Sequence, residues 1–338
     1  MRRRRSRIRV EGAGIAGLCA ALLLARRGCD IVRPPPQKSR ARVVAMPADT
    51  VALLCALWEI EPRDLGPGVA TRARRVDWEA GGSAVMGHPA LILDTADVAA
   101  RLERALPRSA SARENAEADW TIDARGVPPQ RPRAGLRQGL FAHADYDSAR
   151  DEIAVTATDG GWLFTAPDPR GGTVILAVAP DAASMPDAAA LSGWLKRAGH
   201  SGAARSLGAV GAPVPVAPAF SEAPPDADMF PAGDALLAMD PVRGDGTGHA
   251  VRGALLAQAC VAAIDAGADA ARVRAHFRAR MRAVWVSHLT SCIDIYGRAR
   301  APKIWAPDIT LMHAQVAAAD RDFAPFEFRL LGRDLAAA

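Results

Sequence analysis

The amino-acid sequence predicts an α/β fold: a Rossmann-like domain with a parallel sheet, an antiparallel sheet inserted into it, and a C-terminal helical segment. Three observations predict this arrangement. A short apolar strand, a glycine-rich turn and an apolar helix open the chain. Period-two segments fill the stretch from about Arg133 to Pro180. A strongly helical pattern then runs from Ala270 to Arg298.

The opening turn has the glycine spacing of a dinucleotide-binding motif. Gly12, Gly14 and Gly17 follow the strand Ile8-Arg9-Val10 in the pattern G-x-G-x-x-G, and the helical run Leu18 to Leu24 comes next. Gly12 permits a tight turn, Gly14 lets the backbone approach a pyrophosphate, and Gly17 lets the helix pack closely on the sheet. The free N–H groups and the positive dipole end of the helix would then bind the phosphates.

The second strand departs from this motif. An acidic residue about 20 positions further on usually binds the ribose hydroxyls. Here the strand Cys29 to Arg33 runs into three prolines, and Arg33 stands where Glu or Asp is expected. Two interpretations of Arg33 stay open: contact with the adenosine phosphate, or solvation at a strand end.

Composition limits the partners that the chain can have. Hydrophobic residues make up 50% of its 338 residues and charged residues 23%, an ordinary balance for a globular protein. The net charge of +5 comes partly from an arginine-rich start, interpreted as a solvated terminus because the first strand follows immediately. The longest apolar run is too short to cross a bilayer. We therefore expect neither nucleic acid nor a membrane as a partner.

Cysteine and histidine positions indicate the redox state and the metal content. The five cysteines are scattered and lie in apolar surroundings, as expected for buried, reduced thiols in a cytoplasmic protein. The seven histidines show no metal-ligand spacing with them. No metal site is expected.

Helices and strands alternate between the glycine turn and the inserted sheet. We expect a helix over 50–58, a strand over 88–93 and a helix over 94–106. The segment 118–126 predicts a parallel strand that ends in a turn at Gly126, where a doubly wound sheet presents its ligand. The inserted sheet is predicted over residues 136–141, 153–157, 162–165 and 173–178, which Asp, Gly and Pro clusters separate.

A second glycine-rich turn precedes a long apolar helix. A strand leads to Gly233 and Asp234, and the segment MDPVRGDGTGHA over 239–250 begins a helix whose first N–H groups point at an electron-rich ligand. The stretch GDALLAMDPVRGDGTGHA resembles the flavin-closing motif of FAD-dependent monooxygenases, halogenases and related reductases of the para-hydroxybenzoate hydroxylase class. The opening motif, the strand ADWTIDARG and this stretch occur in that family's order, so the resemblance covers most of residues 7–265.

The resemblance implies an FAD site on the two glycine turns. Asp234 would bind the ribityl or phosphate region, and Pro241 with the loop Gly244 to Gly248 would lie along the isoalloxazine ring, where a helix N-terminus stabilises negative charge. The predicted cofactor-binding residues are Gly12, Gly14, Ala16, Gly17, Arg33, Arg42, Gly126, Gly233, Asp234, Pro241, Gly244, Gly246, Thr247 and Gly248. Electrons would come from NAD(P)H or from a separate flavin reductase.

The same resemblance divides the chain into four parts. Residues 1–132 and 218–266 would form the two parts of the FAD-binding domain, residues 133–217 the antiparallel-sheet substrate domain, and residues 267–338 a C-terminal helical region. Five arginines between 272 and 282 resemble a basic binding face, but we interpret them as a solvated helix surface.

The implied activity is that of a FAD-dependent monooxygenase, which hydroxylates an electron-rich aromatic substrate through a flavin C4a-hydroperoxide. The substrate would be an aromatic small molecule or a peptide or protein. The segments GWLFTAP and DPVRGDGTG also look like flavoproteins that hydroxylate a peptidyl tryptophan in quinone-cofactor biogenesis. Two alternatives stay open: a flavin reductase of the geranylgeranyl-reductase type, and a flavin-binding protein without catalysis, which the departures at Glu11 and Arg33 motivate.

The segment Gly161 to Pro167 also resembles the G-W-x-W-x-I-P signature of flavin-dependent halogenases, with Phe164 and Ala166 departing from it. Halogenases need an active-site lysine as well. This chain has lysine only at 38, 196 and 303, outside the stretch in which that lysine is expected. The resemblance therefore disfavours halogenation.

We expect the substrate on the antiparallel sheet, facing the flavin edge that residues 241–249 cover. The candidate pocket residues are His143, Tyr146, Trp162 and Phe164. His249 follows Gly248 at the start of the helix and is the first candidate for the catalytic proton acceptor, with a pKa lowered by the helix N-terminus. The alternative for His249 is packing under the flavin or facing solvent.

Overall fold

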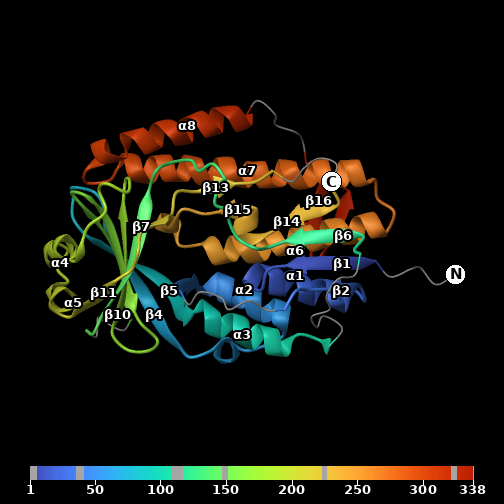
Figure 1. Ribbon diagram of the computed structural model, residues 1–338, viewed down its shortest axis with the longest axis horizontal. Helices are drawn as coiled ribbons and strands as arrows, with labels where there is room; N and C mark the ends of the chain where they lie inside the picture. Colours follow the sequence, from blue (N-terminus) through green and yellow to red (C-terminus); the bar gives the residue numbers. More distant parts are fainter. Residues whose placement is uncertain are drawn as a thin grey trace.

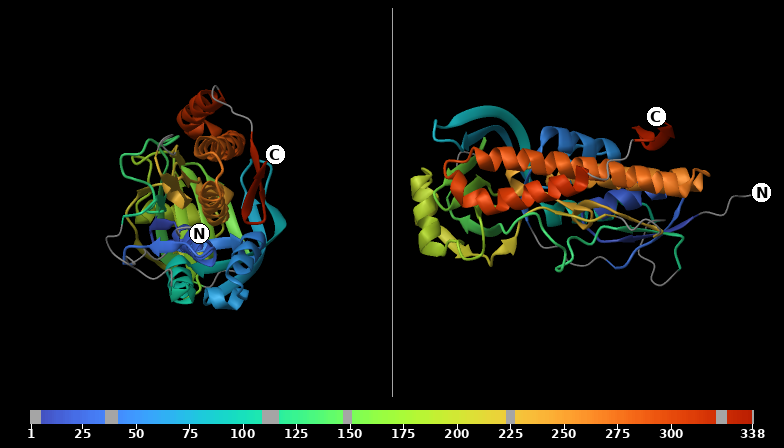
Figure 2. Two further views of the ribbon diagram at one scale, coloured as in Figure 1. Left: turned by 90° about the vertical axis from the view of Figure 1, so that its right-hand side faces the viewer. Right: turned by 90° about the horizontal axis from the view of Figure 1, so that it is seen from above.

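The computed structural model describes residues 6–35, 42–108, 117–146, 151–222, 227–320 and 326–337. The molecule is elongated, with a parallel sheet and its helices toward the N-terminal end and a larger sheet at the opposite end (Figure 1). The long helix α7, Ala270–Gly297, runs along most of this length, and α8, Ala306–Asp320, lies beside it (Figures 1 and 2).

The parallel sheet has four strands in the order β14-β6-β1-β2. Their bounds are Met229–Pro231 for β14, Trp120–Asp123 for β6, Arg7–Glu11 for β1 and Asp30–Val32 for β2. Glu11 pairs with Asp123 and Arg9 with Val32, so the carboxyl ends of these strands share one edge of the sheet. The predicted opening strand and the predicted parallel strand near residue 120 are confirmed.

The larger sheet has nine strands, and its antiparallel part is the predicted insertion. The order is β11-β7-β10-β9-β8-β4-β5-β3, with β12 paired to β7. The four predicted segments correspond to β7, Gln138–Ala144; β8, Glu152–Thr158; β9, Gly161–Pro167; and β10, Thr173–Ala179. The remaining strands on this side are β11, Leu207–Val210, and β12, Val214–Pro215.

Three strands of this sheet come from before residue 133. They are β3, Val43–Pro47; β4, Gly68–Asp77; and β5, Ala84–Asp94. β4 pairs in parallel with β8 and antiparallel with β5, so it joins the two parts of the sheet. The predicted domain boundary at residue 133 stays a prediction, although the sheet draws strands from both sides of it.

Helices cover both sheets. On the parallel sheet, α1, Ile15–Arg26, follows the glycine turn and is buried from Ile15 to Leu24. On the larger sheet, alternate residues of β7, β9 and β10 pack against α4, Ala188–Arg197, and α5, Ser201–Arg205. Trp162 and Leu176 face the main core on the other side. The other helices are α2, Ala48–Trp58; α3, Thr95–Ala105; and α6, Gly246–Asp265.

Short elements complete the fold. They are η1, Pro62–Leu65; η3, Gly233–Ala235; η4, Pro241–Arg243; η5, Pro302–Trp305; β13, Ala219–Phe220; β15, Leu237–Ala238; β16, Phe328–Leu331; and β17, Asp334–Ala337. The region predicted to be helical after residue 267 therefore ends in the hairpin β16–β17. No helix in the described ranges is both long and apolar enough to cross a bilayer.

The arginines of α7 are engaged with the protein itself. Arg272 pairs with Glu327 at 2.6 Å and Arg274 with Asp228 at 2.7 Å, and Arg282 pairs with Glu222. Arg280 lies over the ring of Phe326, 4.7 Å from its centroid. These contacts neutralise three of the five charges, which argues against a basic binding face. Arg272 is solvated as expected, but Arg274 and Arg282 are mostly buried, because their ion pairs hold them against the protein.

Candidate functional site

The first glycine turn is built so that only its middle glycine faces open space. Gly12 has φ +106°, and a Cβ there would overlap the carbonyl oxygen of Ala124. A Cβ on Gly17 would overlap the carbonyl oxygen of Gly12. In contrast, no atom lies within 4 Å of the position that a Cβ on Gly14 would take. The backbone at Gly14 is therefore open to a ligand.

Helix α1 presents free N–H groups at this opening. Gly14 is its N-cap residue, and no side chain caps the helix. The first-turn N–H groups and the positive end of the helix dipole then favour an anionic group such as a phosphate. Binding of a pyrophosphate at this turn stays a prediction.

The second turn lies against the first. A Cβ on Gly233 would lie 2.8 Å from the Cβ of Ala16 in α1, so the two motifs meet there. The next residue, Asp234, is exposed to solvent. Desolvation by its surroundings nevertheless raises the pKa of Asp234, while the positive charges of Arg42 and Arg133 lower it. The structure thus brings Asp234 near Arg42 and Arg133, beside α1.

The start of α6 is also open. Asp245 is its N-cap residue, but its carboxylate does not cap the helix. Instead it accepts hydrogen bonds from Thr50 at 3.1 Å and from Arg252 at 3.0 Å. A Cβ on Gly248 would overlap this carboxylate, which explains the glycine. The N–H groups of the first turn of α6 remain available to an electron-rich group. The contact of residues 244–248 with the flavin ring stays a prediction.

A buried polar cluster holds η4 in place beside α6. Asp240 is 1% exposed and accepts hydrogen bonds from the backbone N–H of Val242 at 2.9 Å and from Arg137 Nε at 2.8 Å. The hydroxyl of Tyr296 in α7 donates to the same carboxylate at 3.0 Å, and Arg137 also pairs with Asp308 of α8. Asp240, Arg137, Tyr296 and Asp308 were all missed in the sequence, because their partners are distant in the chain.

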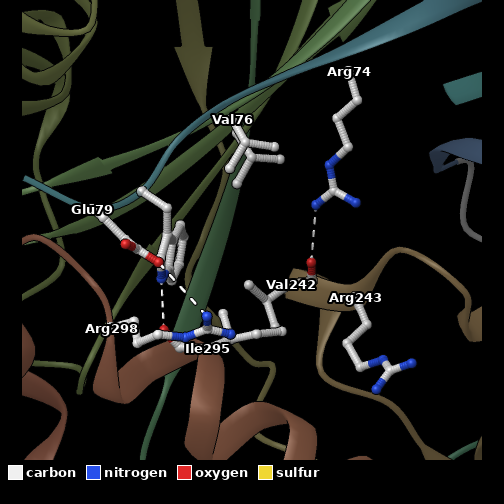
Figure 3. Close-up of a pocket in the computed structure, with 9 residues that line it drawn as sticks. Arg74, Val76, Glu79, Val242, Arg243, Ile295 and Arg298 are labelled. Carbon is white, nitrogen blue, oxygen red and sulfur yellow. Dashed lines mark hydrogen bonds and ion pairs between the residues drawn. The ribbon is translucent and has the colours of Figure 1, made fainter. Parts of the chain in front are cut away.

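A pocket of about 310 Å³ lies between β4, β8, η4 and α7. Its lining residues are Arg74, Val76, Trp78, Glu79, Val155, Val242, Arg243, Ile295 and Arg298. Figure 3 shows Arg74 reaching across to η4, where its Nη2 donates to the carbonyl oxygen of Val242 at 3.1 Å. Trp78 is fixed by a hydrogen bond from its Nε1 to the carbonyl oxygen of Ile295 at 2.6 Å. We call this space the η4 pocket.

None of the four predicted substrate residues lines the η4 pocket. Trp162 is 1% exposed and lies behind Trp78, with 6.2 Å between the ring centroids, and its Nε1 donates to the Tyr296 hydroxyl at 3.2 Å. Phe164 is partly buried in the core. His143 and Tyr146 lie at the far end of β7, where His143 contacts the carbonyl oxygen of Gly171 at 2.9 Å. A role for these four residues in substrate binding stays a prediction.

His249 lies on the other side of this loop. It lines a second pocket of about 290 Å³, together with residues of α7, and its Nε2 is 3.5 Å from Asp245 Oδ2. Burial lowers the pKa of His249, Asp245 opposes this shift, and Arg252 and Arg243 add to it. The direction is the one predicted, but desolvation is its main cause. The catalytic role of His249 stays a prediction.

Arg33 is not solvated. It is 2% exposed, and its Nη1 and Nη2 donate to the two carboxylate oxygens of Glu103 at 2.9 and 2.7 Å. The interpretation as a solvated strand end is wrong, because α3 covers the side chain. Contact of Arg33 with the adenosine phosphate stays a prediction.

The chain matches no protein-family profile and no curated protein in sequence. It is similar to the solved structure of the peptidyl tryptophan dihydroxylase QhpG, essential for tryptophylquinone cofactor biogenesis, with TM-score 0.73 and 19% identity over 99% of this chain and 86% of that one. The chain has the fold of FAD-dependent monooxygenases.

Two further structures share this monooxygenase fold. The myxobacterial chondrochloren halogenase CndH, a variant of FAD-dependent halogenases, matches with TM-score 0.71 and 18% identity over 88% of this chain and 83% of that one. Klebsiella pneumoniae HpxO, solved with FAD and uric acid, matches with TM-score 0.63 and 16% identity over 94% of this chain and 93% of that one. The open backbone at Gly14, the uncapped starts of α1 and α6 and the exposed carboxylate of Asp234 fit the FAD of this fold.

Proposed function

We propose that this protein is a FAD-dependent monooxygenase that hydroxylates an electron-rich aromatic substrate in the η4 pocket. The observation that carries the proposal is the position of this pocket. Its walls are the larger sheet and η4, and η4 begins at Pro241, the residue expected along the flavin ring. A substrate there would lie between the sheet and the cofactor.

Each part of the site would have a defined task. Gly14 and the N–H groups of α1 would hold the pyrophosphate, Asp234 the ribityl or phosphate region, and the N–H groups of α6 the electron-rich edge of the ring. When bound, FAD supplies the redox chemistry and the activation of O₂. Trp78, Val76 and Val155 would orient the substrate ring and exclude water from it.

Hydroxylation is favoured over halogenation by the lysine positions. Lys196 lies on α4 and Lys303 in η5, and neither lines the η4 pocket. Lys38 lies outside the described residues. Among the described residues that line the pocket there is no lysine, so none of them supplies an ammonium group to handle a hypohalous species.

A peptidyl tryptophan is the narrower form of this proposal. The likeness to QhpG supports it, since that protein is a peptidyl tryptophan dihydroxylase. A free aromatic substrate is the alternative, and the likeness to HpxO, which was solved in complex with uric acid, supports a small-molecule ligand. Incubation of the reduced holoenzyme with O₂ and either a tryptophan-containing peptide or free indole compounds would distinguish these forms by mass spectrometry.

The same experiment tests the proposed function. We expect FAD to co-purify or to be taken up, and we expect the product to gain oxygen that derives from ¹⁸O₂. Reoxidation of the flavin without any oxygenated product would contradict the proposal and favour a reductase. A protein that stays colourless in the presence of FAD would favour a flavin-independent scaffold.

A further inference from the structure

Arg74 is a cation in the η4 pocket without a counter-ion. Its Nη2 donates to the carbonyl oxygen of Val242, and its Nε is buried with no hydrogen-bond partner. No carboxylate of the described residues forms an ion pair with it. Figure 3 shows its guanidinium on the opposite side of the pocket from Glu79.

The neighbouring arginine shows what a paired guanidinium looks like on the same strand. Arg75 donates from Nε and Nη2 to the two carboxylate oxygens of Glu152, at 2.7 and 3.0 Å. Arg75 is also the more exposed of the two. The strand therefore places the paired arginine toward solvent and the unpaired one in the pocket.

The other charged groups of the pocket do not balance Arg74. Three arginines and one glutamate are among the lining residues. The glutamate, Glu79, lies 3.9 Å from Arg298, and both of these side chains are more than half exposed. Arg243 adds a further positive charge. His88 lies near enough to Arg74 for that charge to lower the pKa of His88, although burial contributes more.

An unpaired guanidinium next to an apolar pocket favours an anion. Removing a cation from water is unfavourable unless an acceptor with opposite charge replaces the lost hydration. A carboxylate matches the planar guanidinium and can accept two N–H bonds from it. The apolar side chains of Val76, Val155 and Trp78 would then contact the remainder of the ligand.

We propose that the substrate of this site is an aromatic anion whose carboxylate binds Arg74 while its ring packs against Trp78. This inference rests on the proposed function, because it assigns the η4 pocket to the substrate. It favours the free aromatic form of that function over a peptidyl tryptophan, whose side chain carries no carboxylate. Arg74 then acts as the residue that selects for charge, and it orients the ring relative to η4. A neutral or cationic ligand with the same ring leaves the guanidinium unpaired and binds less tightly.

Two sets of probes test this proposal. Within each set the aromatic ring stays the same and the charge of its substituent changes. The first is indole-3-acetate, 3-methylindole and tryptamine, and the second is 4-hydroxyphenylacetate, 4-cresol and tyramine. Binding to the holoenzyme is followed by the flavin absorbance and by tryptophan fluorescence, independently of turnover. We expect the anion of at least one set to bind ten or more times more tightly than the neutral member.

Variants then assign this preference to Arg74. Arg74→Gln should remove it, Arg74→Lys should keep part of it, and the matched control Arg75→Gln should keep all of it, each at equal FAD content. Equal affinities within both sets, no binding of either anion at millimolar concentration, or a preference that survives Arg74→Gln would overturn the proposal. Charge-selective binding without any hydroxylated product would leave this inference standing and contradict the proposed function instead.

Discussion

The hydroxyl of Tyr296 donates to the carboxylate of Asp240, lying 3.0 Å from Oδ1 and 3.1 Å from Oδ2. Tyr296 is fully buried in α7, and Asp240 caps η4, so this contact ties the C-terminal helices to the loop beside the cofactor site. Arg137 completes the contact, because its guanidinium lies 4.8 Å from the centre of the Tyr296 ring and also binds Asp240. The position of η4 therefore depends on α7 and on Arg137.

We predict that Tyr296→Phe destabilises the protein by about 2 kcal/mol, since a buried hydrogen bond to a charged acceptor is lost. The variant also removes the acceptor of Trp162 Nε1. Urea unfolding of parent and variant measures the difference. The chain's other tyrosine, Tyr146, is 43% exposed and provides the control. If Tyr146→Phe and Tyr296→Phe have equal effects, the buried hydrogen bond does not stabilise the fold.

A second prediction concerns pH and His288. Burial lowers the pKa of His288 from 6.5 to about 4, with Asp240 opposing the shift. Its Nε2 accepts the backbone N–H of Asp240 at 2.9 Å, which requires the neutral ring. Between pH 6.5 and 4 the unfolded chain binds the proton and the folded protein does not, so this part of the stability is complete above pH 6.5 and declines as the pH falls.

The decline attributable to His288 should be on the order of 3 kcal/mol. His288→Gln removes the titrating group, so the free energy of unfolding of the variant should depend less on pH across this window. Urea titrations at several pH values give the two curves. Parallel curves for parent and variant would show that other groups cause the acid sensitivity.

The sequence predicted the parts of the fold that depend on local pattern. The Gly12 turn was recognisable because the three glycines and the adjoining strand and helix lie within one short segment. β4 was missed, since its segment GVATRARRVD carries three arginines and mixes exposed with partly buried positions. Arg74, which faces the η4 pocket, lies in that strand. The Arg137–Asp240 contact joins residues 103 positions apart, and sequence periodicity carries no information on such a pair.

A third prediction uses the open space at Gly14. Gly14→Val should abolish FAD retention, because the valine side chain would occupy the space that the pyrophosphate needs. The fold should persist, since no atom lies within 4 Å of the new Cβ. The flavin absorbance of the purified variant and its unfolding midpoint measure the two effects. Gly87→Val, which also faces open space but lies on β5, should retain FAD. A yellow Gly14→Val protein would contradict the assignment.

A fourth prediction separates cofactor binding from folding at Asp234. Asp234→Ala should weaken FAD binding about tenfold, as a hydrogen bond from the cofactor to a charged acceptor is lost. The apoprotein should not lose stability, because its surroundings already raise the pKa of this carboxyl and so disfavour the charged form. Flavin fluorescence titration and apoprotein unfolding give both quantities, with Asp234→Asn expected to lie between parent and Ala variant. A loss of stability at unchanged FAD affinity would show a purely structural role.

The last prediction concerns proton transfer at His249. This side chain is about a quarter exposed, lies beside Asp245 and has a lowered pKa, so near neutral pH the ring is uncharged and can accept a proton. If it takes the proton that the substrate ring releases, His249→Ala at equal FAD content should reduce product formation about 100-fold.

The pH profile of product formation provides the second readout. The parent should lose activity as the pH falls through the pKa of His249, whereas the variant should not show this loss. His249 lines the second pocket and not the η4 pocket, so the pH profile decides more than the rate alone. His313→Ala on the exposed face of α8 is the matched control. A His249→Ala variant with the rate and profile of the parent would show that His249 only packs against Asp245, and that water or another group takes the proton.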